Sequence, residues 1–396
     1  MNNRMIRRIC ICIFILPASL LSSIAFYIES VDATKVDIIA DTVHVGSRPH
    51  SIEFVLGKLY VTNSGSDSVS VIDCKTDKVI STILVGADPH GIAAAAINVG
   101  NQNDNYGPDA DTNLQVYYVY VANTDSNTVS VIDVNTDSII ATIPVGDNPI
   151  DIIASNNSGK VYVTNSGSDS VSVIDSKTNK VIESISIGST PQGLSQIFQN
   201  ETNDRSSAAV ATVYIVNTAS NTVSAINGNT NKVIHTIHVG KEPHGIIAND
   251  LAAQLYVANG GSDSVSIIDA NTNKVTATIP VGNDPHRLDY YMGKVYVTNT
   301  ASNSVSVINP KYKKVVATIP VDTSPRDIAV DNNIGYAFTT NKDANNISII
   351  DLKTNSVIST VPAGHTPNDV IVAFLAPFYK IYITNSDSNS LTVITR

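Results

Sequence analysis

A four-residue motif, Tyr–Val–(Thr/Ala)–Asn, recurs along most of this chain and limits its possible folds more than any other feature. Close copies of the motif end at Asn63, Asn123, Asn165, Asn217, Asn259, Asn299 and Asn385, and a degenerate copy with one extra residue ends at Asn341. The steps between these asparagines are 60, 42, 52, 42, 40, 42 and 44 residues. A period near 42 residues with two long steps predicts a repeat array that contains two insertions.

Each repeat has the composition of four short β-strands. In the third repeat the expected strands are 149–154, 160–164, 170–175 and 180–187, all rich in β-branched residues and bounded by Asn, Gly or Asp turns. No ten-residue stretch of the array shows a helical period of apolar residues. The repeat unit is therefore predicted to be a four-stranded antiparallel sheet.

Proline positions predict which strand lies at the edge of each sheet. The expected fourth strand carries Pro144, Pro280, Pro320 or Pro362 in four of the repeats. Proline cannot donate a ladder hydrogen bond, so this strand belongs at the outer edge, and the first strand of each repeat lies innermost. Four-stranded sheets repeated in this way form a β-propeller.

The two ends of the array predict how the ring closes. The last repeat stops after its third strand, Ser390–Thr395, while Ile38–Gly46 resembles a fourth strand that precedes the first complete repeat. We expect this N-terminal strand to complete the last sheet. The predicted fold is all-β, an eight-bladed propeller of four-stranded antiparallel blades; a seven-bladed ring is the alternative and would leave one unit unpaired.

Residues 1–33 have the pattern of an export segment. Arg4, Arg7 and Arg8 precede an uncharged apolar run, 9–28. This pattern is typical of a secretory signal peptide, and the run is also about long enough to span a bilayer uncleaved as an N-terminal membrane anchor. In the anchored case the arginines would stay in the cytoplasm. Either way we expect 34–396 to be a single extracytoplasmic propeller domain, secreted or held at the cell surface.

The charge of the chain argues against nucleic-acid binding, and its cysteine content indicates how the fold is stabilised. The chain has 25 basic and 35 acidic residues and no basic cluster in the repeats. Nucleic-acid binding needs a concentrated basic face, so nucleic acid is not an expected partner. Cys74 is the one cysteine beyond the export segment, so the fold has no internal disulfide and depends on core packing.

The two insertions, 98–115 and 199–211, both fall between the first and second strands of a repeat and are polar. We expect surface loops there.

Three Asn-x-Ser/Thr triplets are candidate glycosylation sites in an exported protein: Asn156, Asn200 and Asn346. The asparagines that end each motif are expected to adopt left-handed backbone geometry or to bond local backbone, and so to hold a turn.

Histidine supplies the candidate binding residues. The junction between the fourth strand and the next first strand reads Pro-His in four repeats, at His50, His90, His244 and His286. Arg326 occupies the equivalent position in another repeat, and Ile150, Gln192 and Asn368 occupy the rest. Because this junction precedes the innermost strand, these side chains should surround one mouth of the central channel. Imidazoles are common ligands of transition metals, so His50, His90, His244 and His286 are also candidate metal ligands.

No catalytic motif accompanies these residues. The chain has no nucleophile elbow, no phosphate-binding loop and no paired catalytic carboxylates. We therefore expect no catalytic residues and no resident cofactor, and leave open a transition metal at the histidines. An enzyme is the less favoured interpretation.

The motif, followed by Ser-Val-Ser-Val-Ile-Asp and by Ala-Thr-Ile-Pro-Val-Gly, resembles the YVTN-repeat β-propellers, over about residues 39–396. The resemblance implies a cell-surface or surface-layer-associated protein, usually without an assigned enzymatic activity. Similar propellers occur in haem and copper enzymes and in some lactonases, but Cys-x-x-Cys-His is absent from this sequence. We expect a non-enzymatic binding or scaffold module whose partner is a cell-surface or extracellular protein or a glycan. The alternative is a metal-dependent lactonase or oxidoreductase that uses the channel mouth.

Overall fold

The computed structural model describes residues 39–98, 115–199, 210–331, 333–375 and 378–395. All of them belong to one compact unit, Ile38–Arg396. The predicted export segment 1–33, most of both insertions and the candidate glycosylation site Asn200 lie outside the described residues.

The described chain forms eight four-stranded antiparallel sheets, which we call blades 1 to 8 in chain order. Blade 1 contains β2 (Pro49–Val55), β3 (Lys58–Asn63), β4 (Ser68–Asp73) and β5 (Lys78–Leu84). Blade 2 contains β6 (Pro89–Asn98), β7 (Gln115–Asn123), β8 (Thr128–Asp133) and β9 (Ser138–Pro144). Blade 3 contains β10 (Pro149–Ser155), β11 (Lys160–Asn165), β12 (Ser170–Asp175) and β13 (Lys180–Ser186). Blade 4 contains β14 (Pro191–Gln199), β15 (Val210–Asn217), β16 (Thr222–Asn227) and β17 (Lys232–His238).

The second half repeats this order. Blade 5 contains β18 (Pro243–Asn249), β19 (Gln254–Asn259), β20 (Ser264–Asp269) and β21 (Lys274–Pro280). Blade 6 contains β22 (Pro285–Tyr291), β23 (Lys294–Asn299), β24 (Ser304–Asn309) and β25 (Lys314–Pro320). Blade 7 contains β26 (Pro325–Asp331), β27 (Tyr336–Asn341), β28 (Asn346–Asp351) and β29 (Ser356–Pro362). Blade 8 contains β30 (Pro367–Leu375), β31 (Phe378–Asn385), β32 (Ser390–Thr395) and β1 (Ile39–His44).

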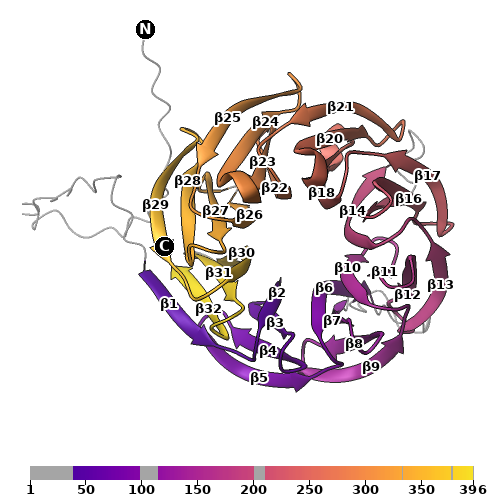
Figure 1. The fold of residues 1–396 in the computed structure, drawn as a ribbon. Helices are drawn as coiled ribbons and strands as arrows, with labels where there is room; N and C mark the ends of the chain where they lie inside the picture. The colour runs from indigo at the N-terminus through magenta and orange to yellow at the C-terminus, as the bar shows by residue number, and fades with distance from the viewer. Residues whose placement is uncertain (1–38, 99–114, 200–209, 332, 376–377, 396) are drawn as a thin grey trace, which may run out of the picture. The chain divides into compact units, whose positions relative to one another are not determined.

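The blades form a closed ring, which confirms the predicted fold class and the count of eight (Figure 1). The first strand of each blade contacts the first strand of the next, from β2 and β6 round to β30 and back to β2. The proline-containing strands β9, β21, β25 and β29 are the outer strands, as predicted. Three short 3-10 helices are also described: η1 (Asp250–Ala252), η2 (Gly260–Ser262) and η3 (Thr300–Ser302). None of the helices in the described ranges is long and apolar enough to cross a membrane.

The ring closes through the N-terminal strand. Strand β1 pairs antiparallel with β32, with Val43 opposite Leu391 and His44 opposite Ser390. In Figure 1 the indigo β1 lies beside the yellow β32. Because β1 supplies the missing fourth strand, blade 8 has the same sheet order as the other blades.

The hydrophobic core lies between neighbouring blades. One cluster joins Tyr60, Val69 and Val71 of blade 1 to Val119 and Ile132 of blade 2. All five side chains are fully buried. The second and third strands contribute most of this core, whereas the outer strands are largely exposed. The small Ser70 between Val69 and Val71 is also buried, consistent with close approach of the next sheet.

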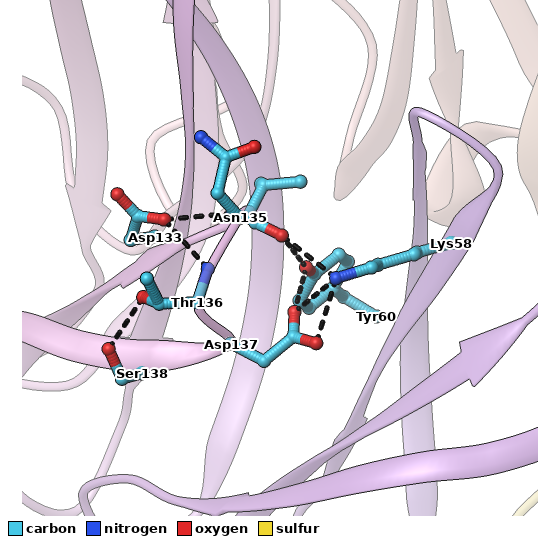
Figure 2. A network of polar contacts seen from close by, with 8 residues as sticks. Lys58, Tyr60, Asp133, Asn135, Thr136, Asp137 and Ser138 are labelled. Atoms are coloured by element: carbon cyan, nitrogen blue, oxygen red, sulfur yellow. Dashed lines mark hydrogen bonds and ion pairs between the residues drawn. The ribbon is translucent and has the colours of Figure 1, made fainter.

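Hydrogen bonds and ion pairs cross the same interfaces between blades. In blade 1 Tyr60 donates its hydroxyl to Asp137 Oδ1 at 2.6 Å, and Lys58 Nζ lies 2.8 Å from Asp137 Oδ2 (Figure 2). Asp137 sits in the turn before the outer strand of blade 2. The same arrangement closes the ring, where Tyr382 and Lys380 of blade 8 bond Asp77 of blade 1. A Tyr hydroxyl at the far end of a buried ring thus fixes the position of the next blade.

The asparagines that end the second strands act differently from our expectation. Asn63 Nδ2 donates to Ser68 Oγ and Ser70 Oγ at 3.2 and 3.0 Å, and Asn165 makes the same pair of bonds to Ser170 and Ser172. Their backbone is extended, with φ of −106° at Asn259. The left-handed residues lie four positions later, as at Asp67 and Asp169. The asparagines are therefore not left-handed, and their side-chain amides donate to serine hydroxyls of the third strand instead of to local backbone.

Candidate functional site at the channel mouth

Each innermost strand begins with proline, and in seven of the eight blades the next residue lines one cavity. The backbone at this position is fixed by the preceding blade: Thr62 Oγ1 donates to the His90 carbonyl at 2.9 Å, and Thr298 Oγ1 donates to the Arg326 carbonyl at 3.0 Å. Across the ring closure, Thr384 Oγ1 donates to the His50 carbonyl at 3.1 Å. The residues at the mouth are therefore positioned by strands rather than by loops.

A cavity of about 260 Å³ lies at this mouth. All five candidate residues named from the sequence line it: His50, His90, His244, His286 and Arg326. The equivalent positions of blades 3 and 4, Ile150 and Gln192, line it as well. The expected placement at one mouth thus agrees with the structure, while the binding role of these residues stays a prediction.

The four histidines form two pairs of neighbours. The His50 and His90 rings have centroids 4.0 Å apart, and the His244 and His286 rings are stacked at 5.4 Å. Burial lowers the pKa of His50 to about 3, with His90 and Arg326 adding to the effect. Burial, followed by Arg326 and Arg287, lowers the pKa of His286 to about 2. Both imidazoles are therefore neutral at physiological pH.

Arg326 is held by its neighbour in blade 8. Its Nε atom donates to Asn368 Oδ1 at 2.9 Å, and Asn368 Nδ2 in turn donates to the His50 carbonyl at 3.2 Å. Within the described residues the Arg326 side chain forms no ion pair. Arg326 lines the cavity, and the bond from its Nε to Asn368 restricts the orientation of the guanidinium plane.

A second layer of charged side chains lies one residue further along the innermost strands. Asp151, Arg287, Asp327 and Asp369 line a second cavity of about 270 Å³, which shares Asp151 and Arg287 with the first. This layer was not among the residues predicted from the sequence. The signal was present, since each residue directly follows the position of the histidines.

The aspartates of this layer connect adjacent innermost strands. Asp369 Oδ2 accepts from the Ile52 amide at 3.0 Å, and Asp327 Oδ2 accepts from the Val370 amide at 3.0 Å. Burial, and next the neighbouring Asp327, holds the pKa of Asp369 well above its usual range. Burial also raises the pKa of Asp151, opposed by the positive charge of Arg287. Burial and the neighbouring carboxyl thus both disfavour the ionised form of Asp369.

Glycine occupies the same position in blades 2, 4 and 5 for a steric reason. A Cβ atom at Gly245 would lie 2.4 Å from the His286 carbonyl oxygen, and one at Gly91 would lie 2.7 Å from the Ile150 carbonyl oxygen. The innermost strands approach too closely there for a side chain. The second layer therefore has glycine in blades 2, 4 and 5, and charged groups in blades 3, 6, 7 and 8.

The structure also bears on the metal and glycosylation predictions. In the part of the chain that is described, no three His, Cys, Asp or Glu side chains gather in a way that could hold a metal ion. Asn156 is exposed, whereas both ends of the Asn346 amide are bonded, to Asp322 and to Asn341. The Nδ2 atom of Asn346, which would carry a glycan, already donates to Asp322 Oδ2 at 2.8 Å.

Solved structures similar to this chain share its fold. The computationally designed Ika8 protein superposes with a TM-score of 0.67 at 11% identity, covering 89% of this chain and 99% of the designed one. BamB from Moraxella catarrhalis superposes at 0.64 with 13% identity, covering 91% and 98%. The dihydro-heme d1 dehydrogenase NirN superposes at 0.62 with 16% identity, covering 90% and 78%. At these identities the likeness shows the fold alone.

The family comparison is more specific than these superpositions. No curated protein matches the chain. The family model of the YNCE-like beta-propellers matches residues 195–394, just over half of the chain, which includes blades 5 to 7 entirely. This match agrees with the resemblance to YVTN-type propellers seen in the repeats. The chain belongs to the YNCE-like beta-propeller family.

Proposed function

We propose that this protein is an exported, non-enzymatic binding module that takes its ligand at the channel mouth. The observation that carries the proposal is the convergence of His50, His90, His244, His286 and Arg326 on one cavity. Concave sites with a few convergent polar groups from several repeats are typical ligand sites. The proposed partner is a cell-surface or extracellular glycan or protein.

The electrostatics of the mouth favour binding over acid–base catalysis. A general acid or base works best when its pKa is near the operating pH. His50 and His286 have pKa values of about 3 and about 2, so both imidazoles remain neutral hydrogen-bonding groups. Two acids of the innermost strands do have pKa values near neutrality, Glu53 at about 7 and Asp289 at about 6. Asp289 accepts the Val330 amide of the next blade, which is a structural use.

Thermal melting with a library of sugars, carboxylic acids, amino acids and metal ions tests the binding role. A ligand present at 100 times its Kd stabilises the folded state by about 2.7 kcal/mol. The expected result is a rise in Tm for wild type that is lost in Arg326→Gln and in His286→Asn. Turnover of lactones or of redox substrates by the purified protein would contradict the proposal.

Export is tested separately by cell fractionation of the full chain. We expect the propeller outside the cytoplasm, either released or attached to the membrane. N-terminal sequencing then distinguishes cleavage near residue 33 from an intact anchor. Recovery of the full chain in the cytoplasm would overturn the export part of the proposal.

A metal-dependent lactonase or oxidoreductase is the second candidate, favoured by the two imidazole pairs at one cavity. If the histidines bind zinc or copper, affinity must fall as the imidazoles are protonated. Calorimetric titration of both metals against wild type and the double variant His244→Ala/His286→Ala decides this. Stoichiometric binding lost in the double variant would support the candidate; no binding at any pH would remove it.

A further inference from the structure

We propose that the channel mouth binds an acidic sugar residue, with the sugar carboxylate held by the terminal nitrogens of Arg326. This inference rests on the proposed binding function and adds the chemical class of the ligand. A hexuronate carries both groups that the lining residues can recognise, one carboxylate and several hydroxyls. It can occur free or as part of a glycan.

The arrangement around Arg326 explains the preference for a carboxylate. Its Nε atom is occupied by Asn368 Oδ1 at 2.9 Å, and Asn368 is itself anchored to the His50 carbonyl. The guanidinium is therefore oriented before any ligand arrives, with its two terminal nitrogens side by side. This fork matches the two oxygens of a carboxylate. Preorganisation reduces the entropy lost when the pair forms.

A second arginine adds positive charge at the inner end of the mouth. Arg287 lines both cavities and, among the described residues, forms no ion pair. Its positive charge and that of Arg326 both lower the pKa of His50 and His286. The mouth thus offers two guanidinium groups beside neutral imidazoles.

The inner carboxylates limit the charge of the ligand. Asp151 lines the mouth cavity, and Asp327 and Asp369 line the cavity beneath it. Asp88 lies 3.8 Å from His90, and the charges of Asp284 and Glu242 oppose the lowering of the His244 pKa by burial. Because burial raises the pKa of Asp369 and Asp151, the repulsion comes mainly from the other carboxylates, and it acts on a dianion such as phosphate more strongly than on a monoanion. A single carboxylate suits this balance of charges.

The remaining lining groups suit hydroxyls. Gln192 Oε1 lies 3.5 Å from His244 Nδ1, and His286 Nδ1 is buried without a protein partner among the described residues. Neutral imidazole, amide and carboxylate groups can all bond sugar hydroxyls. The cavity volume of about 260 Å³ lies just below the range of about 300–1,000 Å³ typical of sites for drug-sized ligands. It therefore suits one sugar residue rather than an extended chain.

Isothermal titration calorimetry at low ionic strength tests the assignment. The probes are galacturonic acid, its methyl ester, galactose, trigalacturonic acid and inorganic phosphate. We expect galacturonic acid to bind wild type at least 10-fold more tightly than its ester, galactose or phosphate. A trigalacturonic acid affinity similar to the monomer indicates a free acid as the natural ligand, and a much tighter one indicates a glycan.

Two variants locate the contact. Arg326→Gln should weaken galacturonic acid binding by about 10- to 100-fold, as expected for a lost charged hydrogen-bonded pair. Arg48→Gln is the matched control, because Arg48 is exposed and lies outside the cavity lining; its effect should stay below about 3-fold. If Arg326→Gln fails to fold, Arg326→Lys keeps the charge without the fork, and we expect it to weaken binding as well.

Several results would overturn the assignment. Equal affinity for the acid and its ester, equal affinity for phosphate, or unchanged affinity in both Arg326 variants would each exclude a carboxylate at Arg326. If no acidic sugar binds but another compound is lost in Arg326→Gln, the sugar class is wrong and the mouth remains a binding site. If ligand binding survives both Arg326→Gln and His286→Asn, the proposed function fails as well.

Discussion

The interfaces between blades and the innermost strands show opposite patterns across the eight repeats. At the interfaces, the second strand repeats a buried Tyr, as at Tyr60, Tyr120 and Tyr162, next to the same Val and Ile positions. At the mouth, the equivalent residues are His, Ile, Gln, Arg or Asn. Uniform positions join each blade to the next, whereas variable positions face one shared space. The difference indicates that packing requires repetition and the candidate site requires asymmetry.

Removing the ring-closing strand should produce the largest effect. Deletion of 34–46 exposes the edge of β32, which now pairs with β1 over six residues. An open flat edge is a template for aggregation, so the variant is expected to precipitate or unfold. Solubility, gel filtration and melting measure this. A soluble variant with unchanged Tm would show that the eight blades need no closure.

Breaking one polar tie between blades should have an intermediate effect. Asp137→Ala removes the partner of both Tyr60 and Lys58 and leaves the Tyr60 hydroxyl at a buried position (Figure 2). We expect a loss of about 1–3 kcal/mol in the free energy of unfolding. Urea denaturation measures it, and Asp133→Ala, at an exposed turn in the same blade, adds a local comparison. Equal ligand affinity in wild type and Asp137→Ala would confirm that the tie serves stability alone.

A smaller effect is expected from an acid of the innermost strands. Burial raises the pKa of Glu53 from its usual 4.5 to about 7. Because the folded state binds the proton more tightly than the unfolded state, this residue reduces stability as pH rises from about 4.5 to 7 and costs nothing below that window. Glu53→Gln should therefore stabilise the protein at pH 8 by about 1–2 kcal/mol relative to wild type. At pH 4 the two proteins should melt alike.

The Glu53 comparison has a clear negative outcome. If Glu53→Gln shifts stability equally at pH 4 and at pH 8, the carboxyl does not titrate in that window. The histidines affect the pH dependence of stability in the opposite direction. His50 and His286 have lowered pKa values, so they reduce the free energy of unfolding as pH falls below about 6.5. Differences between the variant and wild type remove this shared background.

The smallest stability effect is expected at the mouth itself. Arg326→Gln should change the free energy of unfolding by less than about 0.5 kcal/mol, because its side chain is half-buried at the cavity and contributes little to the core. The same variant is the one expected to lose ligand affinity most. A large loss of stability would show that the mouth belongs to the structural part of the ring.

Much of the fold was predictable from local chemistry. The proline of β9, β21, β25 and β29 identified the outer strands, and Ile39–His44 identified the closing strand. The asparagine roles were not predictable in detail, because the serine acceptors at Ser68 and Ser70 come close to Asn63 only once the strands pair. The positions of the four histidines at one mouth followed from their place at the start of the innermost strands.

The sequence by itself determined the repeat, the strand order, the blade count and which residues enter the mouth, because these depend on period, proline and position within a strand. Only the tertiary structure determined which residues contact one another at the mouth. The pairing of His50 with His90, the orientation of Arg326 by Asn368 and the layer of Asp151, Arg287, Asp327 and Asp369 join residues from separate blades. Distances across a ring depend on how all eight blades pack, and so do the desolvation and charge that shift each pKa.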